Sequence, residues 1–507
     1  MKTNKKAISL IVLVITIIVL AILAATVIIT LSNTNIIEQA SKTAFIADMA
    51  NYKQAAGIYI ASQMAENKTG DSSEINLEPG DANYASVFGE VPTQYEGKIS
   101  IEAGKLVYET KDENEKAILE ELGILSSKVD KVVAPGYYES GTSTLKKTWE
   151  ELLQEEMIVV SDGVIISSSA EISGDLVIPE GITSIGSRAF EKNDALTSIV
   201  LSEGVTSISA HAFYECSGLT KVVIPDSVTT IENYAFLMCE SLTSITIPKG
   251  VTTITDGMLS SCSSLTSVVI PEGVTTIGNN AFYACESLTS IEIPEGVTSI
   301  GKCVFQFCSG LTNVVMSDSV TNIDYNLFNG CTSLTSVVLS NNLTTIVKGM
   351  FEDCSALTSI NIPEGVTSIG RAAFSGCTSL VNIDIPDKVT SLDAYVFCEC
   401  AKLTNVKLPS GITSISEGLF DACPALTSIE IPVGVTSIGS YAFMRCTSLA
   451  NIVMPASVTK IGWNAFKDSN AVSDVYYTGT EDNWSLISFN SGNESLTSAT
   501  VHYNHVI

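Results

Sequence analysis

A period of 23 residues dominates this sequence and restricts the folds that it can adopt. A phenylalanine or leucine recurs at this spacing thirteen times without an insertion, at Phe190, Phe213, Phe236, Leu259, Phe282, Phe305, Phe328, Phe351, Phe374, Phe397, Phe420, Phe443 and Phe466. The repeated unit has the form LTSIxIPxGVTSIGxxAFxxCxS, where x is variable. A fixed period of about 20–50 residues is typical of a solenoid in which each repeat forms one turn.

A single repeat of this kind cannot fold alone. It offers about five apolar side chains, each worth roughly 1.5–3 kcal/mol on burial, against about 1–2 kcal/mol of backbone entropy per ordered residue. Stacking places each Phe, Leu and Ile between its copies in the adjacent turns, so stability accumulates over neighbouring interfaces. We therefore expect one continuous solenoid over residues 158–472.

Each repeat predicts two strands. In LTSIxI, the alternation of a strand places Ile199 and Leu201 inward and Val200 outward. The shorter VTSI segment predicts a second strand. A proline follows the first strand in ten of the thirteen repeats, where it ends ladder pairing.

The repeat unit resembles that of the BspA-type leucine-rich-repeat surface proteins, over about two thirds of the chain. The closing stretch VYYTGTEDNWSLISFNSGNESLTSATVHYN, with Trp484 and the paired Tyr476 and Tyr477, resembles the terminal segment of those proteins and predicts a C-terminal cap over residues 473–507. The resemblance implies a β-rich leucine-rich-repeat solenoid on the cell surface and a role in adhesion.

The N-terminal segment predicts a membrane helix. Residues 8–31 form an uncharged apolar run, long enough to cross about 30 Å of hydrocarbon. Lys2, Lys5 and Lys6 precede it, and this positive-inside bias places the N-terminus in the cytoplasm. We therefore expect a single-pass protein of the plasma membrane with most of the chain extracellular. A cleaved signal peptide is the alternative, although its apolar region usually has only about 7–15 residues.

The start KKAISLIVLVITIIVLAILAA also resembles the prepilin N-terminus of type IV pilins. The resemblance implies a basic leader over residues 1–7, cleavage after Ala7, and Ile8 as the new N-terminus. The chain departs from the family at Val12, where pilins usually have a glutamate that meets a neighbouring subunit. Residues 32–157 would continue as a pilin-like helix and a small α+β stalk region, with an amphipathic helix in TLKKTWEELLQEEM.

Charge and composition exclude several functions. A formal net charge of -28 argues against a nucleic-acid partner, and 45% hydrophobic residues argue against disorder. The chain has three histidines, His211, His502 and His505, and no HExxH pattern. We therefore predict no enzymatic activity, no cofactor and no metal site. An enzyme with a solenoid specificity domain would need its active site within residues 32–157, where no catalytic constellation is visible.

Most cysteines follow the repeat. Eleven of the thirteen lie in one column, Cys216, Cys239, Cys262, Cys285, Cys308, Cys331, Cys354, Cys377, Cys400, Cys423 and Cys446, whereas Cys303 and Cys398 lie off it. A disulfide ladder or a thiolate metal site is conceivable outside the membrane, but the paired CxxC spacing of zinc sites is missing. Asn193 and Ser469 end the column, which indicates a small buried residue that faces backbone groups.

The outward position of the first strand is the candidate ligand-binding face. Its first half is mainly apolar, with Val200, Val223, Thr246, Val269, Glu292, Val315 and Val338, and its second half is mainly polar, with Asn361, Asp384, Lys407, Glu430 and Val453. An exposed β-branched strip on a solenoid favours contact with an extracellular protein or glycan, although valine also favours strands in general. A threonine column from Thr183 to Thr459 would order water or ice, or form hydrogen bonds along a turn.

Overall fold

A computed structural model describes residues 99–102, 105–108, 125–126, 136–139 and 145–506. The chain divides into two compact units, Met1–Val132 and Val133–Ile507. In the first unit, the described residues form a three-stranded sheet of β1 (Ile99–Glu102), β2 (Lys105–Tyr108) and β3 (Leu125–Ser126). β1 pairs antiparallel with β2, and β2 pairs parallel with β3.

Several predictions for the N-terminal segment lie outside the described residues. These are the basic leader, the membrane helix over residues 8–31, the processing site at Ala7 and Ile8, and the pilin-like helix. Within the described residues, no helix is long and apolar enough to span a membrane.

The second unit begins with antiparallel strands and one short helix. β4 (Gly136–Tyr138) pairs antiparallel with β5 (Leu145–Thr148) and with β8 (Gly174–Val177). The helix α5 (Trp149–Gln154) begins with a capping box, because Thr148 Oγ1 accepts from the Glu151 amide and Glu151 Oε2 accepts from the Thr148 amide. The helix that we predicted in TLKKTWEELLQEEM is therefore shorter, since its first residues form β5 instead.

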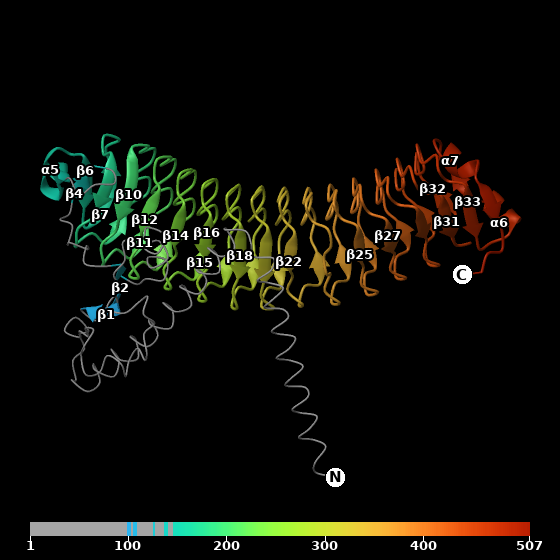
Figure 1. Ribbon diagram of the computed structural model, residues 1–507, viewed down its shortest axis with the longest axis horizontal. Helices are drawn as coiled ribbons and strands as arrows, with labels where there is room; N and C mark the ends of the chain where they lie inside the picture. The colour runs from blue at the N-terminus through green and yellow to red at the C-terminus, as the bar shows by residue number, and fades with distance from the viewer. Residues whose placement is uncertain (1–98, 103–104, 109–124, 127–135, 140–144, 507) are drawn as a thin grey trace, which may run out of the picture. The chain divides into compact units, whose positions relative to one another are not determined.

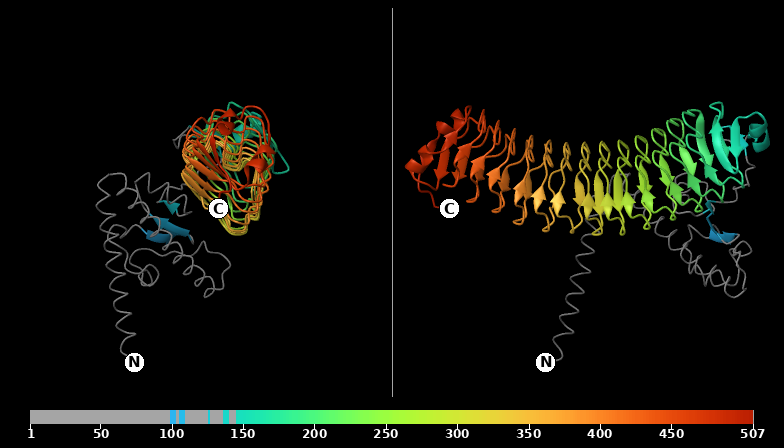
Figure 2. Two further views of the ribbon diagram at one scale, coloured as in Figure 1. Left: turned by 90° about the vertical axis from the view of Figure 1, so that its right-hand side faces the viewer. Right: turned by 180° about the vertical axis from the view of Figure 1, so that it is seen from behind.

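The solenoid follows as a stack of parallel turns (Figures 1 and 2). A hairpin of β6 (Ile158–Ser161) and β7 (Val164–Ser168) opens it. One side is formed by the longer strands, most of which pair with their copy 23 residues later, as Ile199 does with Val222. These strands are β8, β10 (Leu196–Val200), β12 (Lys221–Val223), β14 (Ser244–Thr246), β16 (Ser267–Val269), β18 (Ser290–Ile293), β20 (Asn313–Met316), β22 (Ser336–Val338), β25 (Asn382–Asp384), β27 (Asn405–Lys407), β29 (Ser428–Glu430) and β31 (Asn451–Met454). This ladder is interrupted between β16 and β18, between β22 and β25, and between β27 and β29.

A second side is formed by the two-residue strands of the VTSI segments. These are β9 (Ser184–Ile185), β11 (Ser207–Ile208), β13 (Thr230–Ile231), β15 (Thr253–Ile254), β17 (Thr276–Ile277), β19 (Ser299–Ile300), β21 (Asn322–Ile323), β23 (Thr345–Ile346), β24 (Ser368–Ile369), β26 (Ser391–Leu392), β28 (Ser414–Ile415), β30 (Ser437–Ile438) and β32 (Lys460–Ile461). Their ladder is interrupted between β13 and β15, between β21 and β23, and between β26 and β28.

The third side, here called the turn side, runs from four residues before each periodic aromatic to the cysteine three residues after it. Its backbone also links the turns, as when the Phe213 amide donates to the Ala235 carbonyl over 2.8 Å. Two residues per turn have positive φ, such as Tyr234 (60°) and Met238 (61°), which flank Phe236. In the described residues, none of these left-handed positions holds Val, Ile or Thr, whose branched side chains tolerate this conformation worst.

The periodic aromatic rings stack through the centre of the solenoid. The rings of Phe213 and Phe236 lie 5.1 Å apart with an interplanar angle of 1°, and those of Phe374 and Phe397 lie 5.8 Å apart at 9°. In the series of thirteen positions from Phe190 to Phe466, Leu259 alone is not aromatic, and its side chain is also fully buried. The core therefore depends on neighbouring turns, as the repeat pattern predicted.

The C-terminal segment continues both strand ladders. β33 (Asp474–Tyr477) and β35 (Thr500–His502) extend the side of β31, and β34 (Ser488–Phe489) extends that of β32. Two short helices, α6 (Glu481–Ser485) and α7 (Glu494–Thr497), connect them. Tyr477 is fully buried, and the Trp484 ring meets it edge-on at 5.2 Å. The segment thus places aromatic side chains over the last turn.

Candidate binding surfaces of the solenoid

The strand face consists of the outward residue of each longer strand, and its predicted orientation is confirmed. All seven candidate residues, Val200, Val223, Thr246, Val269, Glu292, Val315 and Val338, are exposed. Val269 and Val338 expose 64% and 54% of their surface. Their strand neighbours, such as Ile199 and Ile245, are buried. Alternation therefore assigned the face correctly, whereas the ligand-binding role of these residues stays a prediction.

The strand face is divided into patches. Val200 pairs directly with Val223, and Thr246 pairs with Val269, so the first four positions form a β-branched strip. Glu292 lies beside Val315 and interrupts this strip with a carboxylate. The mainly polar half contains a hollow of about 340 Å³, lined by Asn361, Ile362, Glu364, Asp384, Ile385, Pro386, Asp387 and Lys407.

The threonine column forms hydrogen bonds along the stack. The hydroxyl of Thr206 donates to the carbonyl of Thr183 over 3.2 Å, and that of Thr459 donates to the carbonyl of Thr436 over the same distance. Hydroxyls that bridge adjacent turns stabilise the corner before each short strand. These hydrogen bonds between turns account for the threonine column, and the column gives no reason to infer an ice-binding surface.

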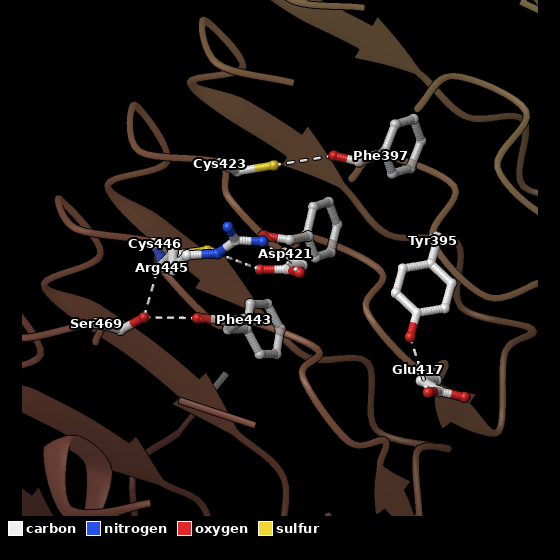
Figure 3. Close-up of polar contacts among 10 residues, drawn as sticks. Tyr395, Phe397, Glu417, Asp421, Cys423, Phe443, Arg445, Cys446 and Ser469 are labelled. Carbon is white, nitrogen blue, oxygen red and sulfur yellow. Dashed lines mark hydrogen bonds and ion pairs between the residues drawn. The ribbon is translucent and has the colours of Figure 1, made fainter. Parts of the chain in front are cut away.

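The cysteine column is buried and faces backbone carbonyls, as predicted. Each column thiol donates to the carbonyl of the periodic residue 26 positions earlier, as Cys423 does to Phe397 over 3.0 Å (Figure 3). Ser469 takes the same place at the end of the column and donates to the Phe443 carbonyl over 2.6 Å. Burial raises the pKa of Cys308 to about 12. All thirteen cysteines are free thiols, so the column is a packing feature.

The turn side carries arginine and tyrosine side chains that the sequence did not single out as a candidate surface. It holds every arginine of the chain, Arg188, Arg371 and Arg445, and every tyrosine of residues 158–472, Tyr214, Tyr234, Tyr283, Tyr325, Tyr395 and Tyr441. Figure 3 shows two of its contacts, in which Arg445 binds Asp421 through two nitrogens at 2.8 and 3.0 Å and the Tyr395 hydroxyl donates to Glu417 over 2.8 Å. Tyr and Arg are among the side chains that are enriched in interface hot spots. A comparison of the variable positions of the repeat unit, written x above, would have shown that arginine and tyrosine gather on this side.

One cluster resembles part of a catalytic triad but lacks its geometry. His502 Nε2 lies 2.8 Å from Asp474 Oδ1, and the Ser473 hydroxyl donates to Asp474 Oδ2 over 2.7 Å. Because the hydroxyl and the imidazole both bind the carboxylate, this contact does not place the imidazole to accept the hydroxyl proton. The hydrogen bond from His502 lowers the pKa of Asp474. In the described part of the chain, no group of three His, Cys, Asp or Glu residues is arranged to hold a metal ion.

Stacked 23-residue turns with parallel strands, periodic aromatics and a capped C-terminal end define a leucine-rich-repeat solenoid. The BspA type leucine rich repeat region, with six copies, matches residues 170–285, 254–381 and 367–493. These matches extend over more than half of the chain, and the chain belongs to the BspA-type leucine-rich-repeat family. The predicted repeat family is therefore confirmed.

Two solved structures illustrate the similarity. A leucine-rich repeat protein from Bacteroides ovatus ATCC 8483 is 28% identical, with a TM-score of 0.57, and the match covers 68% of this chain and 96% of that chain. A leucine rich cell surface protein from Faecalibacterium prausnitzii A2-165 is 31% identical, with a TM-score of 0.42, and the match covers 66% of this chain and 90% of that chain. A search of curated proteins gives no match.

Proposed function

We propose that this protein binds macromolecules at the cell surface and acts as an adhesin. The strip of exposed β-branched side chains from Val200 to Val269 carries the proposal. Exposed apolar side chains in a row lose unfavourable hydration when a partner covers them. Solenoids of this type typically present such extended surfaces for binding. The partner is an extracellular protein or glycan.

The match to the BspA-type family supports a surface role, because the repeat unit of this chain resembles that of the BspA-type leucine-rich-repeat surface proteins. The uncharged run over residues 8–31 and the preceding lysines support an anchored, outward-facing chain. Protease added to intact cells should digest the solenoid. If the solenoid survived until the cells were lysed, the proposed orientation would be wrong.

The binding proposal is tested on the strand face of the full chain. Val200→Glu, Val223→Glu and Val269→Glu introduce charges that a partner must desolvate, and we expect them to weaken adhesion to immobilised matrix proteins or glycans. Asn361→Ser, Asp384→Ser and Lys407→Ser form the matched set in the polar half of the same face. Equal losses from both sets would contradict a contact through the β-branched strip.

A minor pilin or pseudopilin subunit is the alternative function, and the prepilin-like segment KKAISLIVL favours it. In that case, pilin-type subunits would be partners, and the protein would be cleaved between Ala7 and Ile8. N-terminal sequencing of the mature protein and its recovery in sheared filaments would favour this alternative. An intact N-terminus, together with absence from such filaments, would exclude it.

A further inference from the structure

A polar groove crosses the short strands near the middle of the solenoid. Its volume is about 700 Å³, and it extends over four consecutive turns, from β17 through β19 and β21 to β23. Hydroxyl side chains line much of it, namely Thr276, Ser299, Thr321, Thr344 and Thr345. Asp256, Asn279 and Asp324 add carboxylate and amide groups. The groove therefore offers hydrogen-bonding groups along an open path.

The floor of the groove contains the interruption of the ladder between β21 and β23. In the next turn, the Thr367 amide donates to the Thr344 carbonyl over 2.9 Å, and the Gly370 amide donates to the Ile346 carbonyl over 2.8 Å. Among the described residues, no backbone hydrogen bond joins the Thr344, Thr345 or Val347 amides to the turn before them. These amides are therefore available to a ligand, and an unmade bond of this kind is costly if nothing replaces it.

The other two interruptions are closed by side chains. Thr255 Oγ1 donates to the Ile231 carbonyl over 3.0 Å, and the Ser416 hydroxyl donates to the Leu392 carbonyl. The equivalent residue between β21 and β23 is Val347, which has no hydroxyl. No side chain at this position therefore bridges the interruption between β21 and β23, which lies at one end of the groove.

Cations and an aromatic ring follow three of the lining residues directly in the sequence, since Gly301, Asp324 and Val347 line the groove. One column of the repeat holds a cation or a tyrosine in four consecutive turns, namely Lys302, Tyr325, Lys348 and Arg371. Each of these residues directly follows the corner residue that comes after the short strand. Both lysine Nζ atoms lie 5.9 Å from the centre of the Tyr325 ring. In the described part of the chain, none of these three cations has an ion pair. The Glu352 carboxylate interacts electrostatically with Lys348 and Arg371, and the Arg371 guanidinium lies 4.8 Å from the centre of the Tyr395 ring. In a protein of formal net charge -28, the two lysines without an ion pair favour an anionic ligand.

From this geometry we infer that the groove binds an anionic polysaccharide, with its carboxylates on Lys302 and Lys348 and its hydroxyls along the threonines. The site is distinct from the strand face. Lys302 and Lys348 are two turns apart, with Tyr325 in the turn between them. At a rung spacing of about 4.8 Å, their backbone positions lie about 10 Å apart, which suits a polymer whose charges repeat at regular intervals. The Thr344, Thr345 and Val347 amides add donors to sugar oxygens.

The acidic residues of the groove distinguish a polysaccharide from an acidic peptide. Asp324 accepts from the Tyr325 amide over 2.8 Å, and Asp256 accepts from the Asn279 amide over 2.7 Å. Both carboxylates keep further acceptor capacity. Sugar hydroxyls donate to them, whereas the side chains of a poly-glutamate bring only further negative charge. The combination of Asp324 with Lys302 and Lys348 therefore fits a chain that carries both hydroxyls and carboxylates.

The test measures binding of the full-length protein to polygalacturonate, with neutral dextran and poly-glutamate as comparison polymers. We expect polygalacturonate to bind more tightly than either. Lys302→Gln with Lys348→Gln should weaken this binding about tenfold or more, because both cationic contacts to the carboxylates of the polymer are lost. Lys402→Gln with Lys460→Gln removes the same charge elsewhere on the solenoid and should leave the affinity unchanged.

Val347→Thr is the sharper variant, because it changes no charge. Its hydroxyl should bridge to the Ile323 carbonyl, as Thr255 bridges to that of Ile231, and close the end of the groove between β21 and β23. We expect weaker binding of polygalacturonate with an unchanged or raised melting temperature. The inference is overturned if Val347→Thr binds as the parent does, if both lysine pairs have equal effects, or if poly-glutamate binds as tightly as polygalacturonate. Adhesion lost through the strand-face variants is a separate readout, so the two proposals fail independently.

Discussion

The cysteine column and the strand face have the same period, yet only one of them is uniform. The column holds cysteine at eleven buried positions, whereas the strand face changes from Val269 to Glu292 to Val315 over consecutive turns. A column residue fills a fixed space and donates to a fixed carbonyl. A strand-face side chain contacts solvent. Uniformity along the repeat therefore marks a packing constraint, and variation marks a surface that is free to serve recognition.

Alkaline pH should affect the cysteine column more than any single substitution. Burial raises the pKa of Cys262 and Cys308 to about 12, whereas thiols of an unfolded chain ionise near pH 8.5. Because the folded pKa is the higher one, this stability is complete below about pH 8.5 and is lost as the pH rises towards 12, by up to about 1.4 kcal/mol per thiol and pH unit. Urea denaturation at pH 7 and pH 10 should show this loss.

Alkylation gives the control for this prediction. Thiols react as thiolates, so the column should react slowly in the folded protein and quickly in denaturant. Cys303 is only partly buried and should be modified first. Mass spectrometry that found disulfides between consecutive column cysteines, or equal urea midpoints at both pH values, would contradict buried free thiols.

Among the single substitutions proposed here, Phe328→Ala should cause the largest loss of folding stability. The side chain is fully buried between the rings of Phe305 and Phe351, at 5.7 and 5.6 Å. Removal of a buried phenylalanine side chain typically costs about 3–5 kcal/mol. Phe307→Ala is the matched control, because this ring is 45% exposed and should cost far less. Thermal and urea unfolding of both variants measure the difference, and equal losses would mean that the stacked rings are not the core.

Gly330→Ala should have an intermediate effect. Gly330 has a φ of 75°, and an added Cβ would lie 2.4 Å from Cδ1 of Phe307. Strain and crowding together should cost about 1–3 kcal/mol. Gly273→Ala is the control, since its nearest contact would be the Lys249 carbonyl at 3.4 Å and its φ is not left-handed. If both variants had the same unfolding midpoint, the left-handed position would carry no constraint.

Val338→Glu should have the smallest effect on stability. The side chain is 54% exposed, and surface substitutions usually change stability by about 0.5 kcal/mol or less. Val337→Glu, at the preceding and less exposed position of the same strand, should destabilise clearly more, because it turns a charge towards the core. Circular dichroism during urea unfolding would measure both. Similar losses would show that the strand alternation had been assigned to the wrong side.

The sequence determined the period, the two strands of each repeat, the inward and outward residues, and the burial of the cysteines. Ile199, Val200 and Cys423 lie where alternation and periodicity placed them, because these patterns reflect burial that every turn repeats. Patterns within a single segment outside the repeats predicted its secondary structure less well. The strand Leu145–Thr148 replaced the start of a predicted helix, since pairing with Gly136–Tyr138 outweighs helix propensity.

Only the tertiary structure decided which side chains of different turns meet. Lys302, Tyr325 and Lys348 are far apart in sequence and become neighbours because each turn advances by one strand spacing. The missing pairing between β21 and β23 and the groove above it depend on how adjacent turns fit together. A repeat pattern specifies the contacts that all turns share, whereas a binding site at one place depends on contacts that a single pair of turns makes or lacks.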